Sequence, residues 1–190
     1  MLTDRFAQAA LYAIELHRMQ TRKATAIPYV SHPFAVCGLV LEDGGSEDEA
    51  IAALLHDGPE DQGGTLVLDE IRRRFGDAVA AIVAGLSDTM PAPGEEKAPW
   101  RERKEAYLRQ LASAPASVLR VSLADKLHNA RSILVDLGIA GEGVWDRFNA
   151  ARADQAWYYG SLLGVFRERL PGSRNLPGLT RVLAELFPQP

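Results

Sequence analysis

The spacing of apolar residues is helical along almost the whole chain, and this restricts the fold more than any other feature of the sequence. In the first segment Phe6, Ala9, Ala13 and Leu16 recur at steps of three and four residues, which places them on one face of a helix. The sequence has no run of alternating apolar and polar residues, which a half-buried strand would need, and no internal repeat. It therefore predicts an all-α protein.

Capping residues, glycines and prolines divide this pattern into separate predicted helices. Thr3 or Asp4 suits the start of the first helix, and Ser46 and Thr65 suit the starts of two later ones. Pro59 lacks an amide hydrogen, so we expect it to end or distort the helix that follows Ser46. The other predicted helices cover residues 32–43, 77–88, about 100–113, 115–137, 144–170 and 179–187.

We expect one domain, a single helical bundle that covers residues 1–190. Its core is predicted at about residues 5–137 and a C-terminal helical extension at 144–187, with polar loops at 21–31 and 88–99. A chain of 190 residues is long enough to bury a sizeable core.

Charge and cysteine content exclude several classes of protein. The net charge of −4 lacks the basic character of a nucleic-acid-binding protein, so an anionic substrate would need a local cluster of Arg and Lys. The lone Cys37 excludes an intramolecular disulfide, fits a reducing cytoplasm, and is expected to fill space rather than act as a catalytic thiol. No apolar stretch approaches the ~20 residues that cross a bilayer, and the N-terminus lacks the features of a targeting peptide. We therefore expect a cytoplasmic protein.

The segment IAALLHDGPED, residues 51–61, places four titratable groups at the end of an apolar helix. His56 and Glu60 are four residues apart, as are Asp57 and Asp61, so an intact helix would place each pair on one face. From the spacing alone, these groups serve either a chemical reaction or only a solvated helix end.

Two further polar residues stand out, His32 after the first loop and Asp125 in an otherwise apolar helix. An unpaired carboxylate on a buried helix face is costly, so Asp125 should have a metal or a cation as its partner, and an arginine is the alternative to a metal. With His56 and Asp57, these residues form a set of two imidazoles and two carboxylates, which suits divalent Mn, Fe or Zn.

The remaining candidates have simpler expected roles. Asn129 and Ser132 share a helix face with Asp125 and are suited to contact a bound ligand, whereas His17 and His128 are expected to be capping or core groups. Aromatic residues in the C-terminal part are expected to pack in the core rather than stack on a base, although Tyr158 or Tyr159 is placed to offer a hydroxyl to a substrate. This aromatic stretch includes Trp145, Phe148, Trp157, Tyr158 and Leu162.

His32, the His56-Asp57 pair and Asp125 match the H…HD…D pattern, in which the chain resembles the HD-domain metal-dependent phosphohydrolases. The segments RKATAIPYVSHP, AALLHDGPED, FGDAVAAIVAGLSD and LADKLHNAR resemble the hydrolase domain of the RelA/SpoT family and its stand-alone relatives, the small alarmone hydrolases. The resemblance covers roughly residues 5–137. No segment is left over for a synthetase domain, so we expect hydrolysis without synthesis.

The resemblance implies a single HD-type phosphohydrolase domain and a set of site residues. One Mn²⁺ ion, or another divalent transition metal, would be held by His32, His56, Asp57 and Asp125. Glu60 and Asp61 match the family's catalytic acidic pair, which orients or deprotonates the attacking water and manages the proton of the leaving group.

The resemblance also implies the substrate and its contacts. Arg22 and Lys23 match the pair that contacts the nucleotide, and Tyr29, Asn129 and Ser132 are expected to contact the base and ribose. The implied activity is metal-dependent hydrolysis of the 3′-diphosphate of guanosine or adenosine alarmones such as (p)ppGpp, with release of pyrophosphate. The expected partner is a small nucleotide, with no nucleic acid and no membrane, and the pattern does not indicate an oligomeric state.

One departure from the family leaves the base preference open. Many members have a glycine after the RK pair, whereas this chain has Ala24 in the longer loop RKATAIPY. Two alternative functions also stay open: an HD phosphohydrolase for another nucleotide phosphate, of the nucleotidase or NADPH 2′-phosphatase type, and a non-catalytic nucleotide sensor. A sensor would usually have lost a metal ligand or the acidic pair, and all six positions are intact here.

Overall fold

A computed structural model describes residues 1–23, 25–87 and 98–188, and these residues form nine α-helices. A π-helical turn joins α3 to α4 and a 3₁₀ turn joins α7 to α8. The elements are α1 (Asp4–His17), α2 (Ser31–Glu42), α3 (Glu47–Leu55), η1 (Pro59–Gly63), α4 (Gly64–Phe75), α5 (Asp77–Leu86), α6 (Trp100–Ser113), α7 (Ala116–Ala140), η2 (Gly141–Arg147), α8 (Arg152–Arg169) and α9 (Leu176–Leu186). The all-α prediction is confirmed.

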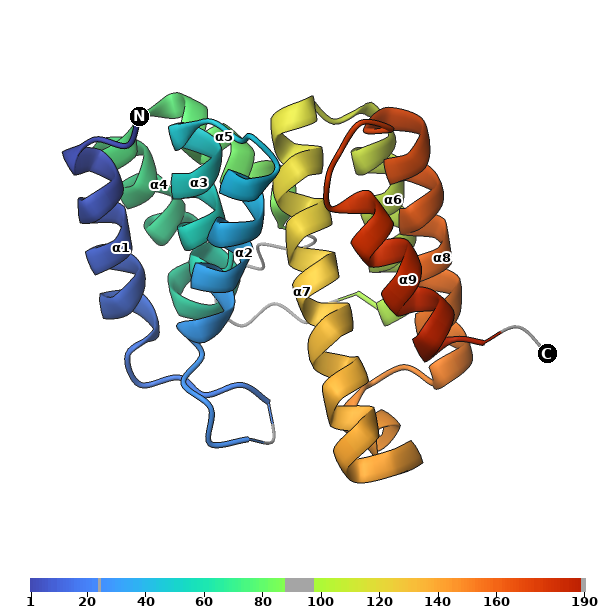
Figure 1. Cartoon of the computed structure of the whole chain (residues 1–190). Helices are drawn as coiled ribbons and strands as arrows, with labels where there is room; N and C mark the ends of the chain where they lie inside the picture. Colours follow the sequence, from blue (N-terminus) through green and yellow to red (C-terminus); the bar gives the residue numbers. More distant parts are fainter. Residues whose placement is uncertain (24, 88–97, 189–190) are drawn as a thin grey trace.

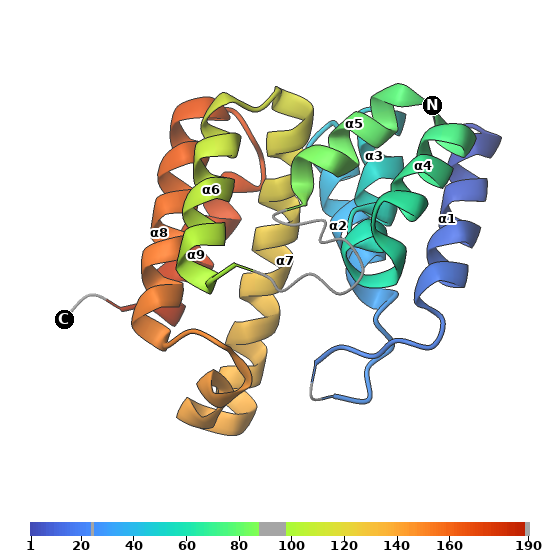
Figure 2. The same cartoon turned by 180° about the vertical axis from the view of Figure 1, so that it is seen from behind.

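Helix α7 is the central element of the fold. It contacts α2, α3 and α5 on one side and α8 and α9 on the other, while α6 packs on α8 (Figures 1 and 2). The loop between α1 and α2 and the 3₁₀ turn η2 lie at the same end of the molecule, on either side of the C-terminal part of α7. Of the predicted site residues on α7, Asp125 lies in the middle of the helix, and Asn129 and Ser132 follow toward this end.

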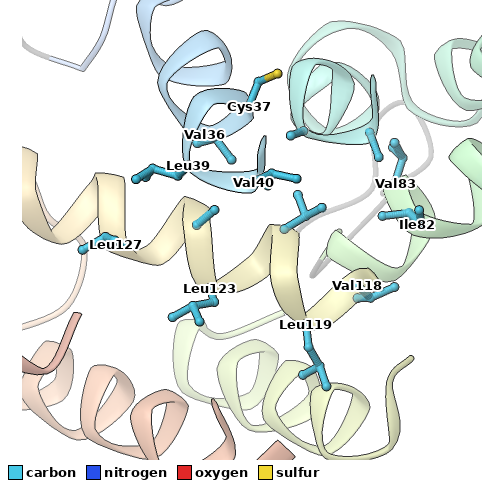
Figure 3. Packing of buried hydrophobic residues seen from close by; sticks show 14 of the residues in the cluster. Val36, Cys37, Leu39, Val40, Ile82, Val83, Val118, Leu119, Leu123 and Leu127 are labelled. Atoms are coloured by element: carbon cyan, nitrogen blue, oxygen red, sulfur yellow. The ribbon is translucent and has the colours of Figure 1, made fainter. Parts of the chain in front are cut away.

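The hydrophobic core surrounds α7, which explains why its sequence is apolar on more than one face. Val36 and Val40 of α2 pack on one side, while Leu119 and Leu123 point from α7 toward the other side (Figure 3). Each such side chain contributes about 1.5–3 kcal/mol on full burial. Cys37 is also buried, in agreement with its predicted role as a space-filling residue.

The predicted helix starts are confirmed at two of three positions. Thr3 caps α1 through a hydrogen bond from the Arg5 amide, and Ser46 forms a reciprocal capping box with Glu49 at the start of α3. The prediction for Thr65 is wrong, because the π-helical turn continues directly into α4 and leaves Thr65 within its first turn. The same turn bears out the expected distortion at Pro59.

Three boundaries in the C-terminal half differ from the prediction. Helix α7 continues through Gly138 to Ala140 and ends at Gly141, whose φ of +60° favours glycine. The predicted helix 144–170 is broken, because the extended backbone of Phe148 separates the 3₁₀ turn η2 from α8. Helix α9 begins at Leu176 rather than 179, since proline is tolerated in a first turn.

Other predictions lie partly or wholly outside what the structure tests. Residues 88–97 of the predicted loop 88–99, and the last residue of the predicted helix 77–88, lie outside the described residues. The division into a core and an extension stays a prediction. Of the helices described, none has both the length and the apolar character needed to span a bilayer.

Candidate functional site

The four predicted metal ligands come from three parts of the fold and lie together. His32 is in the first turn of α2, His56 and Asp57 follow α3, and Asp125 lies in the middle of α7. The Nε2 atom of His32 lies 3.4 Å from Oδ2 of Asp57 and 3.2 Å from Oδ1 of Asp125. The Nε2 atom of His56 lies 3.2 Å and 3.8 Å from the same two oxygens. We call these four residues the His–Asp cluster.

Both imidazoles of the His–Asp cluster are held through Nδ1, so that Nε2 faces the carboxylates. Nδ1 of His56 lies 2.8 Å from the carbonyl oxygen of Ala53, one turn earlier in the chain. Nδ1 of His32 lies 2.8 Å from Nδ1 of His128 on α7. The fully buried apolar run before His56 anchors that end of α3 in the core. Packing and hydrogen bonds thus orient the two rings before any ligand binds.

The chemistry of the His–Asp cluster fits a divalent cation. Nε2 of His56 is buried and has no hydrogen-bond partner within the described part of the chain. One ligand atom each from His32, His56 and Asp57 lies within 4.8 Å of the others. Imidazole nitrogens and carboxylate oxygens are the donors that Mn, Fe and Zn accept. A cation among them would satisfy this nitrogen and offset the charge of two adjacent carboxylates.

The charges of the cluster shift its pKa values in opposite directions. Burial alone would lower the pKa of His56, but the negative charges of Asp57 and Asp125 raise it to about 9. Burial alone would raise the pKa of Asp125, but the positive charge of Lys126 and the contacts with two histidines hold it well below its usual range. The pKa of Asp57 is likewise lowered, against burial, by the charge of His56. Both carboxylates are therefore ionised near neutral pH.

Three side chains outside the cluster donate hydrogen bonds to its carboxylates. The hydroxyl of Tyr29 lies 2.6 Å from Oδ2 of Asp57. Nζ of Lys126 lies 2.6 Å from Oδ2 of Asp125, and Nδ2 of Asn129 lies 2.6 Å from Oδ1 of the same carboxylate. The alternative of an arginine partner for Asp125 is wrong, because the cation paired with it is Lys126. Tyr29 thus binds a cluster carboxylate, and its contact with base and ribose stays a prediction.

Glu60 and Asp61 lie in the π-helical turn rather than on an intact helix. The amide of Asp61 donates to the carbonyl oxygen of Asp57 at 2.9 Å, so the acidic pair stays within one turn of the cluster. Oδ2 of Asp61 accepts a hydrogen bond of 2.8 Å from Nε2 of Gln20. No motif in the sequence indicates Gln20, which anchors this turn from the start of the loop between α1 and α2. The catalytic role of the pair stays a prediction.

A cavity of about 720 Å³ lies beside the cluster, and its lining includes Arg22, Lys23, Asn129 and Ser132 but not Tyr29. Nη2 of Arg22 donates to Oδ1 of Asn129 at 3.2 Å, and Asn129 in turn donates to Asp125. Asn129 therefore connects the cavity with the His–Asp cluster. The hydroxyl of Ser132 donates to the backbone carbonyl of His128 at 3.0 Å. Glu60 and Asp61 are not among the described lining residues.

The lining of the cavity is strongly cationic, although the whole chain has a net charge of −4. The lining carboxylate of Asp136 is paired with Arg147 at 2.8 Å. The cationic lining residues are Arg22, Lys23, Lys104, Lys126, Arg131 and Arg147. A cluster of this kind is the local positive potential that a polyphosphate needs.

Aromatic residues also line the cavity. Trp145, Tyr158 and Leu162 are buried in the core, as predicted, but Tyr158 and Phe148 also line the cavity. The hydroxyl of Tyr158 is buried and finds no hydrogen-bond partner among the residues that the structure describes. Tyr158 therefore lines the cavity and carries a buried hydroxyl that is unpaired within the described residues.

Comparison with known proteins assigns the chain to one family. Residues 9–154 match the family model described as HD domain. The chain belongs to the HD-domain family. Its HD domain carries His32, His56, Asp57 and Asp125 in the order of the H…HD…D pattern, and the structure brings these four side chains together.

Relatives with assigned activities are found within the HD-domain family. The guanosine-3′,5′-bis(diphosphate) 3′-pyrophosphohydrolase MESH1 of Xenopus tropicalis is 36% identical over 129 residues, which cover 66% of this chain and 68% of that protein. The bifunctional (p)ppGpp synthase/hydrolase SpoT of Escherichia coli is 35% identical over 135 residues, 68% of this chain but 18% of SpoT. The solved structure of a metazoan SpoT ortholog that hydrolyses ppGpp has a TM-score of 0.77 at 25% identity, with 97% of each chain covered.

Proposed function

We propose that this protein hydrolyses the 3′-diphosphate of a guanosine or adenosine alarmone such as (p)ppGpp and releases pyrophosphate. The observation that carries this proposal is the contact between the His–Asp cluster and a cationic cavity of about 720 Å³, made through Asn129. The named activities of the relatives support the choice of a 3′-diphosphate over other phosphate esters.

The proposed metal is one Mn²⁺ ion, held by His32, His56, Asp57 and Asp125, although the same donors suit other divalent transition metals. When bound, such an ion lowers the pKa of water and neutralises charge on a phosphoryl oxygen. Tyr29, Lys126 and Asn129 keep the two carboxylates oriented toward the histidines.

The cavity and the acidic pair have separate proposed roles. Arg22 and Lys23 bind the diphosphate groups, with Arg22 held by Asn129, and Ser132 lines the same wall. Glu60 and Asp61 orient the attacking water and take up its proton. The oxygen of water bonds to the phosphorus attached to the 3′ oxygen, and the bond between that phosphorus and the 3′ oxygen breaks. The acidic pair passes the proton taken from water to the 3′ oxygen, which leaves as a hydroxyl.

The expected setting is the cytoplasm, with a small nucleotide as the partner rather than nucleic acid or a membrane. Cys37 is the lone cysteine of the sequence, so the chain forms no intramolecular disulfide, which suits a reducing compartment. Cys37 is buried, and burial raises the pKa of its thiol to about 11.

Product analysis with a panel of nucleotides tests the proposed function. Purified protein with Mn²⁺ is incubated with ppGpp, ppApp, GTP and NADPH, beside an Asp125→Ala control. We expect pyrophosphate from at least one 3′-diphosphate, absent in the control, and the two bases are ranked by rate. Phosphate released only from GTP or NADPH would overturn the substrate assignment and favour another HD phosphohydrolase. No turnover of any nucleotide would favour the sensor.

A further inference from the structure

His128 makes a contact that its expected role as a capping or core group does not explain. It lies on α7 three residues after Asp125, and its Nδ1 atom is 2.8 Å from Nδ1 of His32. The two ring centroids are 4.9 Å apart. The contact joins residues 96 positions apart in the sequence, between α2 and α7.

The surroundings of His32 decide which nitrogen donates in this contact. Nε2 of His32 faces Asp57 and Asp125, so its lone pair is the one placed to bind a cation in the cluster. A neutral ring that binds a cation through Nε2 has its proton on Nδ1. With the cation bound, His32 therefore donates from Nδ1, and Nδ1 of His128 accepts.

The protonation of Nε2 of His128 follows from the role of its Nδ1 as an acceptor. A ring that accepts at Nδ1 is neutral and carries its proton on Nε2. His128 also lines the cationic cavity, beside Arg22, Asn129 and Ser132, and no hydrogen bond to its Nε2 occurs within the described residues. Its Nε2–H group is thus an available donor at the boundary between the cluster and the cavity.

We propose that His128 is a positioning residue with two roles: its Nδ1 fixes the tautomer and orientation of His32 for the metal, and its Nε2–H donates to a phosphate oxygen of the nucleotide. The second role rests on the proposed function. The first role needs only that His32 binds a divalent cation. Both roles use one neutral ring, so arginine or lysine at this position would not replace it.

Two substitutions separate the roles, because each amide reaches one ring nitrogen. The Oδ1 atom of His128→Asn is placed near the position of Nδ1 and accepts from His32, whereas the amide nitrogen of His128→Gln is placed near Nε2 and donates into the cavity. His128→Phe removes both groups. Far-UV circular dichroism and the melting temperature of each variant establish that it is folded.

The first measurement is a titration of the protein with Mn²⁺ in the absence of nucleotide. The electron paramagnetic resonance signal of the free ion reports how much Mn²⁺ is bound. We expect a Kd about 10–100-fold higher for His128→Gln and His128→Phe, and a Kd within about threefold of the parent for His128→Asn. Equal affinity in all four proteins, or loss in His128→Asn equal to that in His128→Gln, would overturn the first role.

The second measurement is ppGpp hydrolysis at saturating Mn²⁺. His128→Asn should raise KM about tenfold with kcat nearly unchanged, and His128→Gln should restore KM toward the parent value. An unchanged KM in His128→Asn would overturn the second role. If the parent protein does not hydrolyse ppGpp, the proposed function and the second role fail together. The Mn²⁺ titration requires no turnover, so it still decides the first role.

Discussion

The hydroxyl of Tyr29 donates a hydrogen bond of 2.6 Å to Oδ2 of Asp57, the same oxygen that faces His32 and His56. Tyr29 belongs to the loop before α2, and Asp57 follows α3. The contact connects the loop that carries Arg22 and Lys23 with the His–Asp cluster. A hydroxyl that holds a metal-binding carboxylate in place affects metal affinity as well as catalysis.

Substitution Tyr29→Phe removes this hydroxyl and leaves the ring. We expect Mn²⁺ affinity to fall about tenfold, because the Asp57 carboxylate loses the donor that orients it. Isothermal titration with Mn²⁺ measures the change. Tyr12→Phe is the matched control. Tyr12 lies on α1, is buried against Phe75 of α4, and is outside the cluster. Equal Mn²⁺ affinity for Tyr29→Phe and the parent would contradict the role given to the hydroxyl.

Metal binding is predicted to stabilise the fold through residues from α2, α3 and α7. At a Mn²⁺ concentration of ~100 Kd the stabilisation is about 2.7 kcal/mol, which corresponds to a rise in melting temperature of roughly 5–10 °C for a chain of this size. Asp125→Asn, which keeps the shape of the side chain, should abolish the rise. A rise of the same size in the variant would show that Mn²⁺ binds elsewhere.

How much of the site can be predicted from the sequence depends on how far apart in the sequence the contacting residues lie. His56, Asp57, Glu60 and Asp61 lie in one short segment, so their relation follows from local spacing. The contacts between His32 and His128, and between Gln20 and Asp61, join residues 96 and 41 positions apart and depend on how α7 and the first loop pack. No local pattern contains that information, so the sequence predicts only a capping or core role for His128.

Among the helix boundaries, too, those set by neighbouring residues are predictable from the sequence and those set by tertiary packing are not. Ser46 and Thr3 act as caps because capping needs only neighbouring residues. No glycine or proline next to Phe148 signals the break. Trp145 before the break and Tyr159 after it are buried, and both rings lie against Phe187, with centroids 5.7 and 6.2 Å from its ring. Tertiary packing overrides the helical spacing there.

Cys37 is predicted to be unreactive in the folded protein. Burial raises the pKa of its thiol to about 11, so the charged thiolate is disfavoured and scarce at pH 8. A thiol reagent such as DTNB should react only as fast as the protein opens, and at once in denaturant. Cys37→Ala should cost about 1 kcal/mol of stability and leave activity intact. Rapid labelling of the native protein, or lost activity in the folded variant, would restore the catalytic-thiol interpretation.

Tyr158 is predicted to contact the substrate through its hydroxyl. Because this buried hydroxyl has no partner among the described residues, Tyr158→Phe should leave the melting temperature nearly unchanged, and Tyr158 is a lining residue of the cavity. KM for ppGpp should rise about three- to tenfold, as expected for one lost hydrogen bond. Steady-state kinetics with Tyr12→Phe as the control tests this. A changed melting temperature with unchanged KM would assign Tyr158 to core packing alone.

The central claim is that the His–Asp cluster and the adjoining cationic cavity together hydrolyse a 3′-diphosphate. The most direct measurement is ³¹P NMR of a reaction of the purified protein with ppGpp and Mn²⁺, beside the folded Asp125→Asn variant. The account predicts GDP and pyrophosphate in equal amounts, with neither product formed by the variant. Orthophosphate as the first product, or ppGpp that stays intact while Mn²⁺ is bound, would contradict it.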